Sequence, residues 1–292
     1  MRHAQASWTA KAVATMRVIA SSSGAAILDP GDLASAALLS SHLRGIARAS
    51  AMLGGTSENL LRACFRVGGH LVDHVALRTR LIDRMIAEAI DSGARQLILL
   101  GAGLDARAYR MPELRDVKVF EVDHPASQHY KIAHSRNLNP TCRALTHVAL
   151  DFNKDDLVTS LLQCGYQSNV LSCFVCEGVF PYLIHDAVAQ TLDAVSRLSV
   201  DGSRLVATYL PSSARFPTHV RLLARPVLRL LGEPFGEDWS PNAFAEMANT
   251  NGFQVVDDLE TSRWPLALGV ASKGPLFDYE RLALLERYGC VT

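Results

Sequence analysis

The chain has 292 residues, of which 49% are hydrophobic and 20% are charged, a composition typical of a soluble globular enzyme with a sizeable core. Its 29 basic and 29 acidic residues give a formal net charge of zero, so charge gives no reason to expect binding to nucleic acid or to an anionic membrane. No apolar run of about eighteen residues predicts a membrane span, and residues 1–9 lack the apolar core of a signal peptide, so we expect a cytoplasmic protein.

No metal site is predicted. The six cysteines are scattered along a chain too long to need disulfides, and we expect reduced, mostly buried thiols. Cys173 and Cys176 are spaced like a redox or zinc pair, but they lie on a predicted strand, where residues three apart point to opposite faces. His70 and His74 share a helical face without a third ligand at a usable spacing, which favours hydrogen-bonded or solvent-facing side chains.

Residues 1–92 are predicted to form an N-terminal helical cap. Helical spacing of apolar residues covers much of 1–50, with a break at 29–32, and a second helical region over 59–91 is predicted in two pieces around Gly68-Gly69. The pattern fits two roles equally well: the helices could cover the ligand end of a sheet, or they could simply pack against the core.

Residues 93–292 are predicted to form a Rossmann-like α/β core with a mostly parallel sheet and helices on both faces. The expected strands are 96–100, 117–122, 144–150, 170–176, 204–209 and 253–256, with a last strand over 264–271. Helices are expected over 185–198 and 242–249, the second opened by Ser240-Pro241. Prolines interleaved with apolar residues predict a helical insertion over about 211–240, which we interpret as a substrate lid.

The ends of the first four strands carry the residues that indicate a ligand site. Gly101-Ala102-Gly103 follows the first strand, where the glycines permit a tight turn and a close approach of a ligand to the backbone. Asp123 follows Gly103 by about the twenty residues at which a ribose-binding acid is expected. Asp151-Phe152 and Glu177 follow the third and fourth strands. Since parallel strands end at one edge of their sheet, these residues are predicted to converge.

This arrangement fits NAD, FAD or S-adenosylmethionine. Asp105 lies at the start of the helix after the glycines, where a dinucleotide would place its pyrophosphate beside a like charge. S-adenosylmethionine has no phosphate, and its sulfonium and ammonium groups favour nearby carboxylates. Asp105 is also suited to cap the helix under either ligand, so it discriminates only in part.

Three motifs in order carry a family resemblance. Residues 99–110, 121–125 and 177–183 resemble the leucine carboxyl methyltransferase family, which includes many bacterial S-adenosylmethionine-dependent O-methyltransferases. Arg78-Thr79-Arg80 is also similar to the family's pattern, and the resemblance extends from about residue 9 to residue 260. It implies a class I methyltransferase fold with S-adenosylmethionine as the cofactor.

The resemblance also implies roles for individual residues. Gly101 and Gly103 line the methionine part of the cofactor, in the same turn as the candidates Ala102 and Asp105. Asp123 binds the ribose hydroxyls, and Asp151 and Phe152 lie beside the adenine. Around the methionine end, the implied contacts are Glu177 at the amino group and sulfonium, Arg78 at the carboxylate and Arg17 as a second basic contact.

We therefore expect an S-adenosylmethionine-dependent O-methyltransferase that acts on a carboxylate or phenolic hydroxyl of a small molecule, such as a secondary metabolite. Tyr182 and His219 are the candidate catalytic residues. His219 could orient a carboxylate acceptor or deprotonate a phenol. Tyr182 could donate a hydrogen bond to the substrate or the cofactor, or its side chain could simply pack under the turn. The alternatives are methylation of a protein C-terminal carboxylate, NAD-dependent oxidoreduction, and cofactor binding without catalysis. No oligomeric state is predicted.

Overall fold

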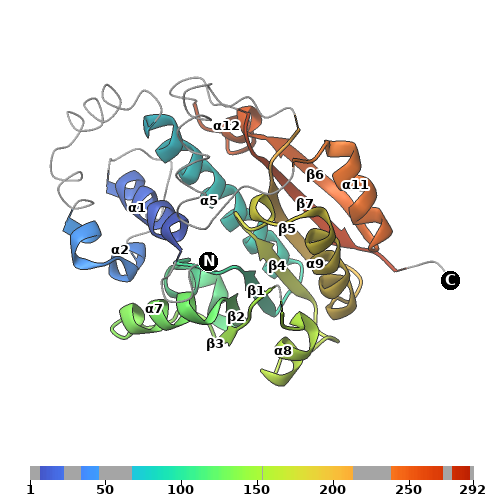
Figure 1. Cartoon of the computed structure of the whole chain (residues 1–292), viewed down its shortest axis with the longest axis horizontal. Coiled ribbons are helices and arrows are strands. Elements are labelled where there is room, and N and C mark those ends of the chain that lie inside the picture. The colour runs from blue at the N-terminus through green and yellow to red at the C-terminus, as the bar shows by residue number, and fades with distance from the viewer. Residues whose placement is uncertain are drawn as a thin grey trace.

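The computed structural model describes residues 7–22, 34–45, 68–152, 154–212, 238–271 and 278–289. Within these ranges the chain forms a seven-stranded sheet flanked by helices (Figure 1). Its strands are β1 (Gln96–Leu100), β2 (Lys118–Asp123), β3 (Ala144–Ala149), β4 (Ser172–Cys176), β5 (Arg204–Tyr209), β6 (Phe253–Glu260) and β7 (Arg281–Arg287). The predicted strands are confirmed as far as β5, and β6 is longer than predicted.

The strand order is β3-β2-β1-β4-β5-β7-β6. The pairs from β3 to β5 are parallel, whereas β7 is antiparallel to both β5 and β6. From β1 the chain builds β2 and β3 on one side, and then crosses to build β4 and β5 on the other. This reversal places a crevice beyond the carboxyl ends of β1 and β4, where ligands of open α/β sheets bind. The α/β fold with a mostly parallel sheet is confirmed.

The sheet is buried on both faces, which explains why its central strands are continuous apolar runs. All five residues of β1 are buried. Ile98 packs into the core cluster on one face, and its neighbour Leu97 packs into the cluster on the other. Cys173 and Cys176 of β4 divide between the two clusters in the same way, as their spacing predicted.

Helices cover both faces. The helices and 3-10 turns of this region are α5 (Gly68–Asp91), α6 (Arg107–Arg110), η1 (Pro112–Asp116), α7 (Pro125–Ser135), α8 (Leu157–Gln163), η2 (Phe180–Tyr182), α9 (His185–Leu198), α11 (Pro241–Thr250), η3 (Thr261–Arg263) and α12 (Trp264–Ala267). Residues of α8, α9 and α11 join one core cluster, and residues of α5 and α12 join the other. The predicted start of α11 is confirmed: the Ala243 N–H donates to the Ser240 hydroxyl over 3.1 Å, with Pro241 in the first turn.

The two N-terminal helices pack at the ligand end of the sheet. Helix α1 (Trp8–Ser22) contacts α5, and α2 (Ala34–Leu38) contacts α1 and α7 (Figure 1). Ala14 and Val18 of α1 and Leu38 of α2 form a third cluster with Leu104 and Ala106, which follow β1. Helix α5 also lies before residue 92, but it covers the sheet beside β4 and β5. The division of the chain at residue 92 stays a prediction.

The strand predicted over 264–271 is wrong. Trp264 begins the short helix α12, and Pro265 occupies a first-turn position, where its fixed φ suits a helix. The Trp264 ring is fully buried, and its Nε1–H donates to the Leu259 carbonyl over 3.1 Å. The last strand is instead β7. Most of the predicted lid, 213–237, and the candidate His219 lie outside the described residues.

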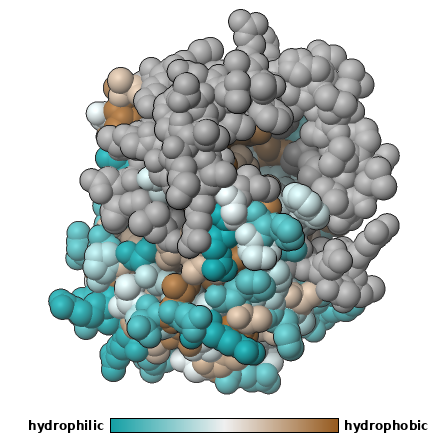
Figure 2. Space-filling view, turned by 90° about the vertical axis from the view of Figure 1, so that its left-hand side faces the viewer, coloured by the Kyte–Doolittle hydropathy of each residue, from teal (hydrophilic) through white to brown (hydrophobic). Residues whose placement is uncertain are grey.

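The face that carries α1, α2 and α7 is mostly hydrophilic where the structure describes it, with apolar residues interspersed (Figure 2). Of the helices in the described ranges, none has the length and apolarity needed to cross a membrane.

Helix α12 offers a test of the corrected fold. Replacing the fully buried Trp264 by alanine should reduce the free energy of unfolding by about 3–5 kcal/mol, because it removes a large core side chain and leaves a cavity. Leu266 on the same helix is 83% exposed, so Leu266→Ala should change stability by less than about 0.5 kcal/mol. Denaturant unfolding followed by circular dichroism measures both, and equal small losses would contradict this packing.

Candidate functional site

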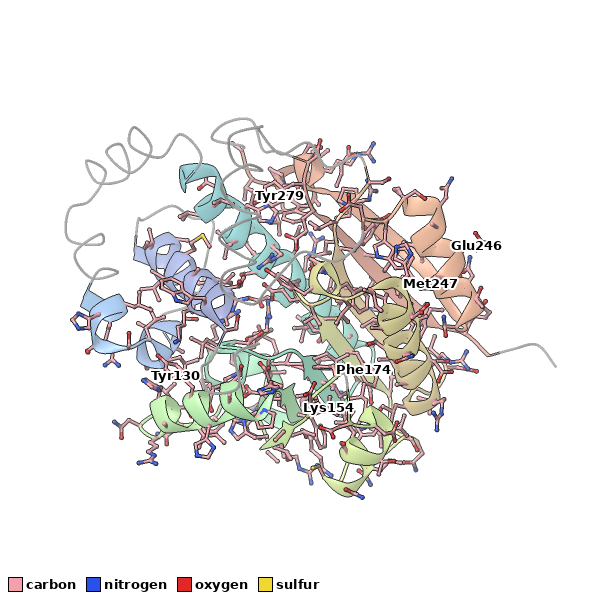
Figure 3. The ribbon with its side chains drawn as sticks, in the orientation of Figure 1. Tyr130, Lys154, Phe174, Glu246, Met247 and Tyr279 are labelled. Atoms are coloured by element: carbon pink, nitrogen blue, oxygen red, sulfur yellow. The ribbon has the colours of Figure 1, made fainter. Side chains whose placement is uncertain are left out.

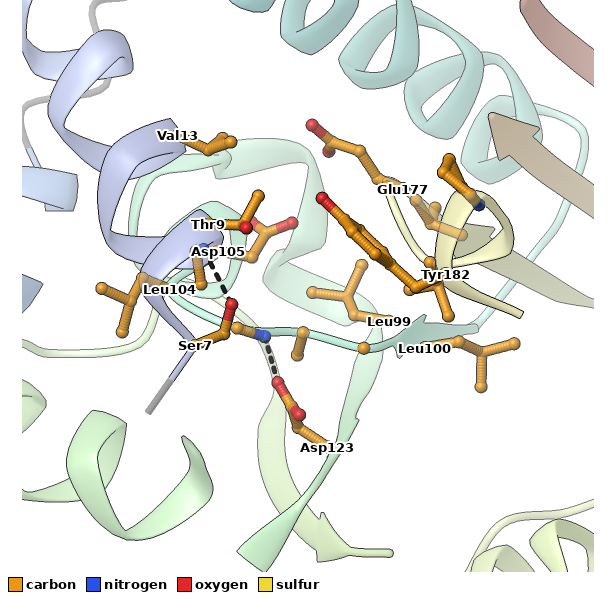
Figure 4. Close-up of a pocket in the computed structure, with 18 of the residues that line it drawn as sticks. Ser7, Thr9, Val13, Leu99, Leu100, Leu104, Asp105, Asp123, Glu177 and Tyr182 are labelled. Atoms are coloured by element: carbon orange, nitrogen blue, oxygen red, sulfur yellow. Dashed lines mark hydrogen bonds between the residues drawn. The ribbon is translucent and has the colours of Figure 1, made fainter. Parts of the chain in front are cut away.

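A cavity of about 810 Å³ lies beyond the carboxyl ends of the central strands, with α1 as one wall. Figure 4 shows the side chains of Asp105, Glu177 and Tyr182 converging on the space between α1 and the strand ends. The walls include every predicted site residue that the structure describes: Arg17, Arg78, Gly101, Ala102, Gly103, Asp105, Asp123, Asp151, Phe152, Glu177 and Tyr182. The predicted convergence of these residues is therefore observed, while their roles stay proposals.

The glycine turn after β1 has no room for side chains. Gly101 and Gly103 have φ values of +67° and +46°, in the left-handed region that favours glycine. A Cβ on Gly101 would overlap the Val179 side chain, and one on Gly103 would lie 3.1 Å from the Ala10 Cβ of α1. The amide N–H groups of Gly101 and Ala102 both donate to the Val122 carbonyl, over 2.8 and 3.0 Å. The turn is thus fixed to β2 and presents bare backbone to the cavity.

Asp123 at the end of β2 faces this turn. One carboxylate oxygen accepts the Gly103 N–H (Figure 4), and the other accepts the His124 N–H over 2.6 Å. Burial raises the pKa of Asp123, although both backbone N–H groups favour its ionised form. The carboxylate is therefore positioned by the backbone and has lone pairs left for a ligand.

Glu177 after β4 is shared by three arginines. Its Oε1 accepts from Arg17 Nη2 at 2.7 Å and from Arg78 Nε at 3.0 Å, and its Oε2 accepts from Arg107 Nη1 at 2.8 Å. Burial alone would raise the pKa of Glu177, but the three guanidinium charges hold it well below its usual range. Glu177 is therefore ionised, and it joins α1, α5 and α6 to the end of β4.

Asp105 is paired with Arg107. Its carboxylate accepts the Arg107 backbone N–H over 2.8 Å and is ion-paired with the Arg107 guanidinium. Ala106, not Asp105, occupies the N-cap position of α6. Burial opposes ionisation, but Arg107 and Arg17 hold the pKa of Asp105 below its usual value. Because Arg107 balances this charge, Asp105 discriminates less against a dinucleotide than its position in the sequence suggested.

The cavity wall also contains His74, Tyr279 and Glu280, which are not among the predicted site residues. Arg78 Nη1 donates to both carboxylate oxygens of Glu280, at 3.0 and 2.9 Å, and Glu280 also lies 2.5 Å from His74 Nε2. Glu280 and its neighbour Tyr279 directly precede β7, whose insertion between β5 and β6 brings them to the cavity. No local motif marks these two residues. The spacing of His70 and His74 predicts a hydrogen-bonded or solvent-facing side chain, and it does not identify Glu280 as the partner of His74.

The remaining predicted residues lie on two further sides of the cavity. Asp151 and Phe152 follow β3, and Lys154 Nζ lies 3.2 Å from Asp151 Oδ2. Tyr182 ends the short turn η2 after β4. Ser7 and Thr9 at the start of α1 complete the wall beside the glycine turn (Figure 4).

Known structures share this fold. A DUF574 family protein from Streptomyces avermitilis superposes with a TM-score of 0.61 at 13% identity, over 97% of this chain and 98% of that one. A putative methyltransferase from Thermobifida fusca superposes with a TM-score of 0.56 at 16% identity, over 98% and 96% of the two chains. At these identities the likeness shows the fold alone.

The sequence relatives have a higher identity to this chain than these structures, but their alignments cover a smaller part of it. A Mycobacterium avium protein named "Putative S-adenosyl-L-methionine-dependent methyltransferase" is 38% identical over 146 residues, which are 50% of this chain and 46% of that protein. A Mycolicibacterium paratuberculosis protein of the same name is 36% identical over 150 residues, or 51% and 48% of the two chains. The alignments thus span about half the length of these relatives.

The family itself follows from a longer match. Residues 10–196, well over half of the chain, match the family model described as Leucine carboxyl methyltransferase. This range includes most of α1, with Arg17, and also the glycine turn, Asp123 and Glu177. The chain therefore belongs to the leucine carboxyl methyltransferase family.

Proposed function

We propose that this protein is an S-adenosylmethionine-dependent O-methyltransferase that acts on a carboxylate or hydroxyl group of a small molecule. The observation that carries the proposal is the meeting of the glycine turn, Asp123 and Glu177 in one cavity of about 810 Å³. Membership of the family supports it, as do the names of the mycobacterial relatives.

The residues of the cavity fit S-adenosylmethionine. A Cβ on Gly101 or Gly103 would meet Val179 or Ala10, so the turn keeps bare backbone in the cavity wall, which suits a ligand lying against it. Asp123 is placed to accept hydrogen bonds from ribose hydroxyls, as acids at the end of the second strand do in nucleotide-binding sheets. Asp151 and Phe152 would then hold the adenine from the end of β3.

The other end of the cavity suits the methionine part. Arg17 and Arg78 would hold its carboxylate, and the ionised Glu177 would face its ammonium and sulfonium charges. When bound, the cofactor supplies an electrophilic methyl group on sulfur. The chain's own part is to position the reactants and exclude water, and its paired charges need little reorganisation when the reaction occurs.

The size and lining of the cavity favour a small acceptor over a docked protein. Ligand pockets for small molecules are about 300–1,000 Å³ and mostly apolar. Val13 and Met16 of α1, Leu71 and Val75 of α5 and Leu183 after η2 supply apolar wall. Tyr182 lies in the same wall, where its hydroxyl would meet substrate or cofactor. His219 remains a candidate from the sequence alone.

Cofactor identity is tested by isothermal titration calorimetry of the purified protein. We expect S-adenosylhomocysteine to bind with one site per chain and NAD to give no binding heat, because Asp105 and Asp123 beside the glycine turn would lie near the negative charges of a pyrophosphate. Binding of NAD without binding of S-adenosylhomocysteine would replace the proposal by an oxidoreductase.

Asp123 is tested by substitution. Asp123→Ala should weaken S-adenosylhomocysteine binding about 10–100-fold, the loss expected for hydrogen bonds to a charged group worth about 1.5–3 kcal/mol. The exposed Asp116 in η1 provides the control, since Asp116→Ala removes the same charge outside the cavity. Circular dichroism verifies that both variants fold. Equal affinities of the two variants would remove Asp123 from the site.

A further inference from the structure

His74 is a buried titratable group in the cavity wall that the cofactor does not require. It lies on α5 one helical turn before Arg78 and is 2% exposed. Its Nε2 lies 2.5 Å from Glu280 Oε2. Its Nδ1 is also buried, and among the described residues it has no hydrogen-bond partner. Buried polar atoms without a partner are rare in native proteins and call for an explanation.

The position of the imidazole is fixed from two directions. Its ring stacks on Tyr279, with centroids 4.4 Å apart, and contacts the Trp264 ring at 4.7 Å. Figure 3 shows Tyr279 over α5, where this contact is made. Glu280, its hydrogen-bond partner, is held in turn by Arg78 through both carboxylate oxygens. A ring fixed in this way cannot turn freely to satisfy Nδ1 elsewhere.

Glu280 also determines which ring nitrogen carries the proton. Burial alone would raise the pKa of Glu280, but Arg78 and His74 lower it to about 2, so its carboxylate is an acceptor only. The Nε2–H of a neutral His74 therefore donates to Glu280, and the lone pair is left on Nδ1. This is the arrangement in which a carboxylate orients a histidine base.

We propose that His74 is the general base of this methyltransferase, and that the acceptor is a small molecule with a hydroxyl group, such as a phenol. The inference rests on the proposed function. The step requires the bound acceptor to displace the part of the wall that buries Nδ1. The acceptor O–H bond then breaks, its proton joins Nδ1, and its electron pair stays on oxygen. That oxygen then bonds to the methyl carbon as the carbon–sulfur bond breaks, with the bonding pair left on sulfur. The proton is later released to water.

The surroundings suit such a base. Burial lowers the pKa of His74 below its ordinary value, and the nearby Glu280 opposes this shift, so the ring is neutral near neutral pH. The charged groups that face it are Glu280, Arg78 on its own helix and Glu177 after β4. Once His74 takes a proton, the Glu280 carboxylate stabilises the imidazolium.

The charges of the wall favour a hydroxyl over a carboxylate. A carboxylate is already ionised and needs no base, but it needs a cation to receive it. In the described part of the wall, Arg17 and Arg78 are assigned to the methionine carboxylate and Lys154 faces Asp151, which leaves no further arginine or lysine there for an acceptor carboxylate. Leu71 and Val75 of α5 line the cavity with His74 and provide apolar surface for the body of a neutral acceptor.

The first test compares His74→Phe, which keeps a ring between Tyr279 and Trp264, with His134→Phe. His134 is a matched control because it also stacks on a tyrosine, Tyr130 at 3.9 Å, and does not line the cavity. Release of S-adenosylhomocysteine is measured with a panel of phenols and the matching benzoic acids. For a phenol, kcat should fall about 10²–10⁴-fold in His74→Phe and stay unchanged in the control. Calorimetric affinity for S-adenosylhomocysteine should stay within about threefold in both.

The second test measures the protonation state of His74. In ¹⁵N-histidine NMR spectra of the S-adenosylhomocysteine complex near neutral pH, His74 should be neutral and protonated on Nε2. Glu280→Gln, which removes the carboxylate partner, should move the acid limb of the kcat–pH profile to lower pH, because the imidazolium loses its stabilising charge.

The outcomes separate the two proposals. A charged imidazole, an Nδ1-protonated ring, or methylation of benzoic acids that His74→Phe does not slow would overturn the role of His74 while leaving a methyltransferase. Failure of the wild-type protein to bind S-adenosylhomocysteine would overturn the proposed function itself. If none of the phenols or benzoic acids is methylated, the protonation state of His74 in the NMR spectra decides whether its proposed role stands.

Discussion

One buried carboxylate ties together segments that are far apart in the sequence. Glu177 binds Arg17, Arg78 and Arg107, which lie 160, 99 and 70 residues away on α1, α5 and α6. Burying such charges is costly, but removing one partner from a buried ion pair costs about 3–5 kcal/mol, because the remaining charges lose their compensation. Glu177 therefore ties α1, which lies over the ends of the strands, to α5, α6 and the end of β4.

The same interaction extends toward the proposed acceptor. Arg78 contacts Glu177 through Nε and Glu280 through Nη1, and Glu280 contacts His74. A continuous line of hydrogen bonds thus joins the region proposed for the methionine end of the cofactor to the proposed base. Such a line fixes each dipole and charge before a ligand arrives, which is the form of electrostatic preorganisation that enzymes use. It also explains why a charged network is tolerated beside an apolar wall, since every carboxylate in it has a guanidinium or imidazole partner.

Sequence patterns predicted the parts of the fold and site that depend on local chemistry. The apolar runs of β1 and β4, the glycines at 101 and 103 and the acids at 123 and 177 are local signals, and parallel topology brings them together. Glu280 could not be predicted, because its place in the site depends on β7 pairing antiparallel between β5 and β6. The apolar stretch from Trp264 suggested a strand, but Pro265 and burial of the indole favoured a helix. The place of Glu280 depends on long-range strand pairing, and the helix at Trp264 depends on tertiary packing, so neither follows from local sequence.

The dependence of α1 on Glu177 can be measured by hydrogen–deuterium exchange in Glu177→Gln, which keeps the shape of the side chain and removes its charge. Glu246→Gln on the outer side of α11 is the control (Figure 3). Arg17 would retain a hydrogen bond to Thr79 but lose its ionic partner. We predict faster exchange along α1 in Glu177→Gln, with β1 and β4 as protected as in the wild type and the control. Unchanged protection of α1 would show that Glu177 does not hold this helix over the cavity.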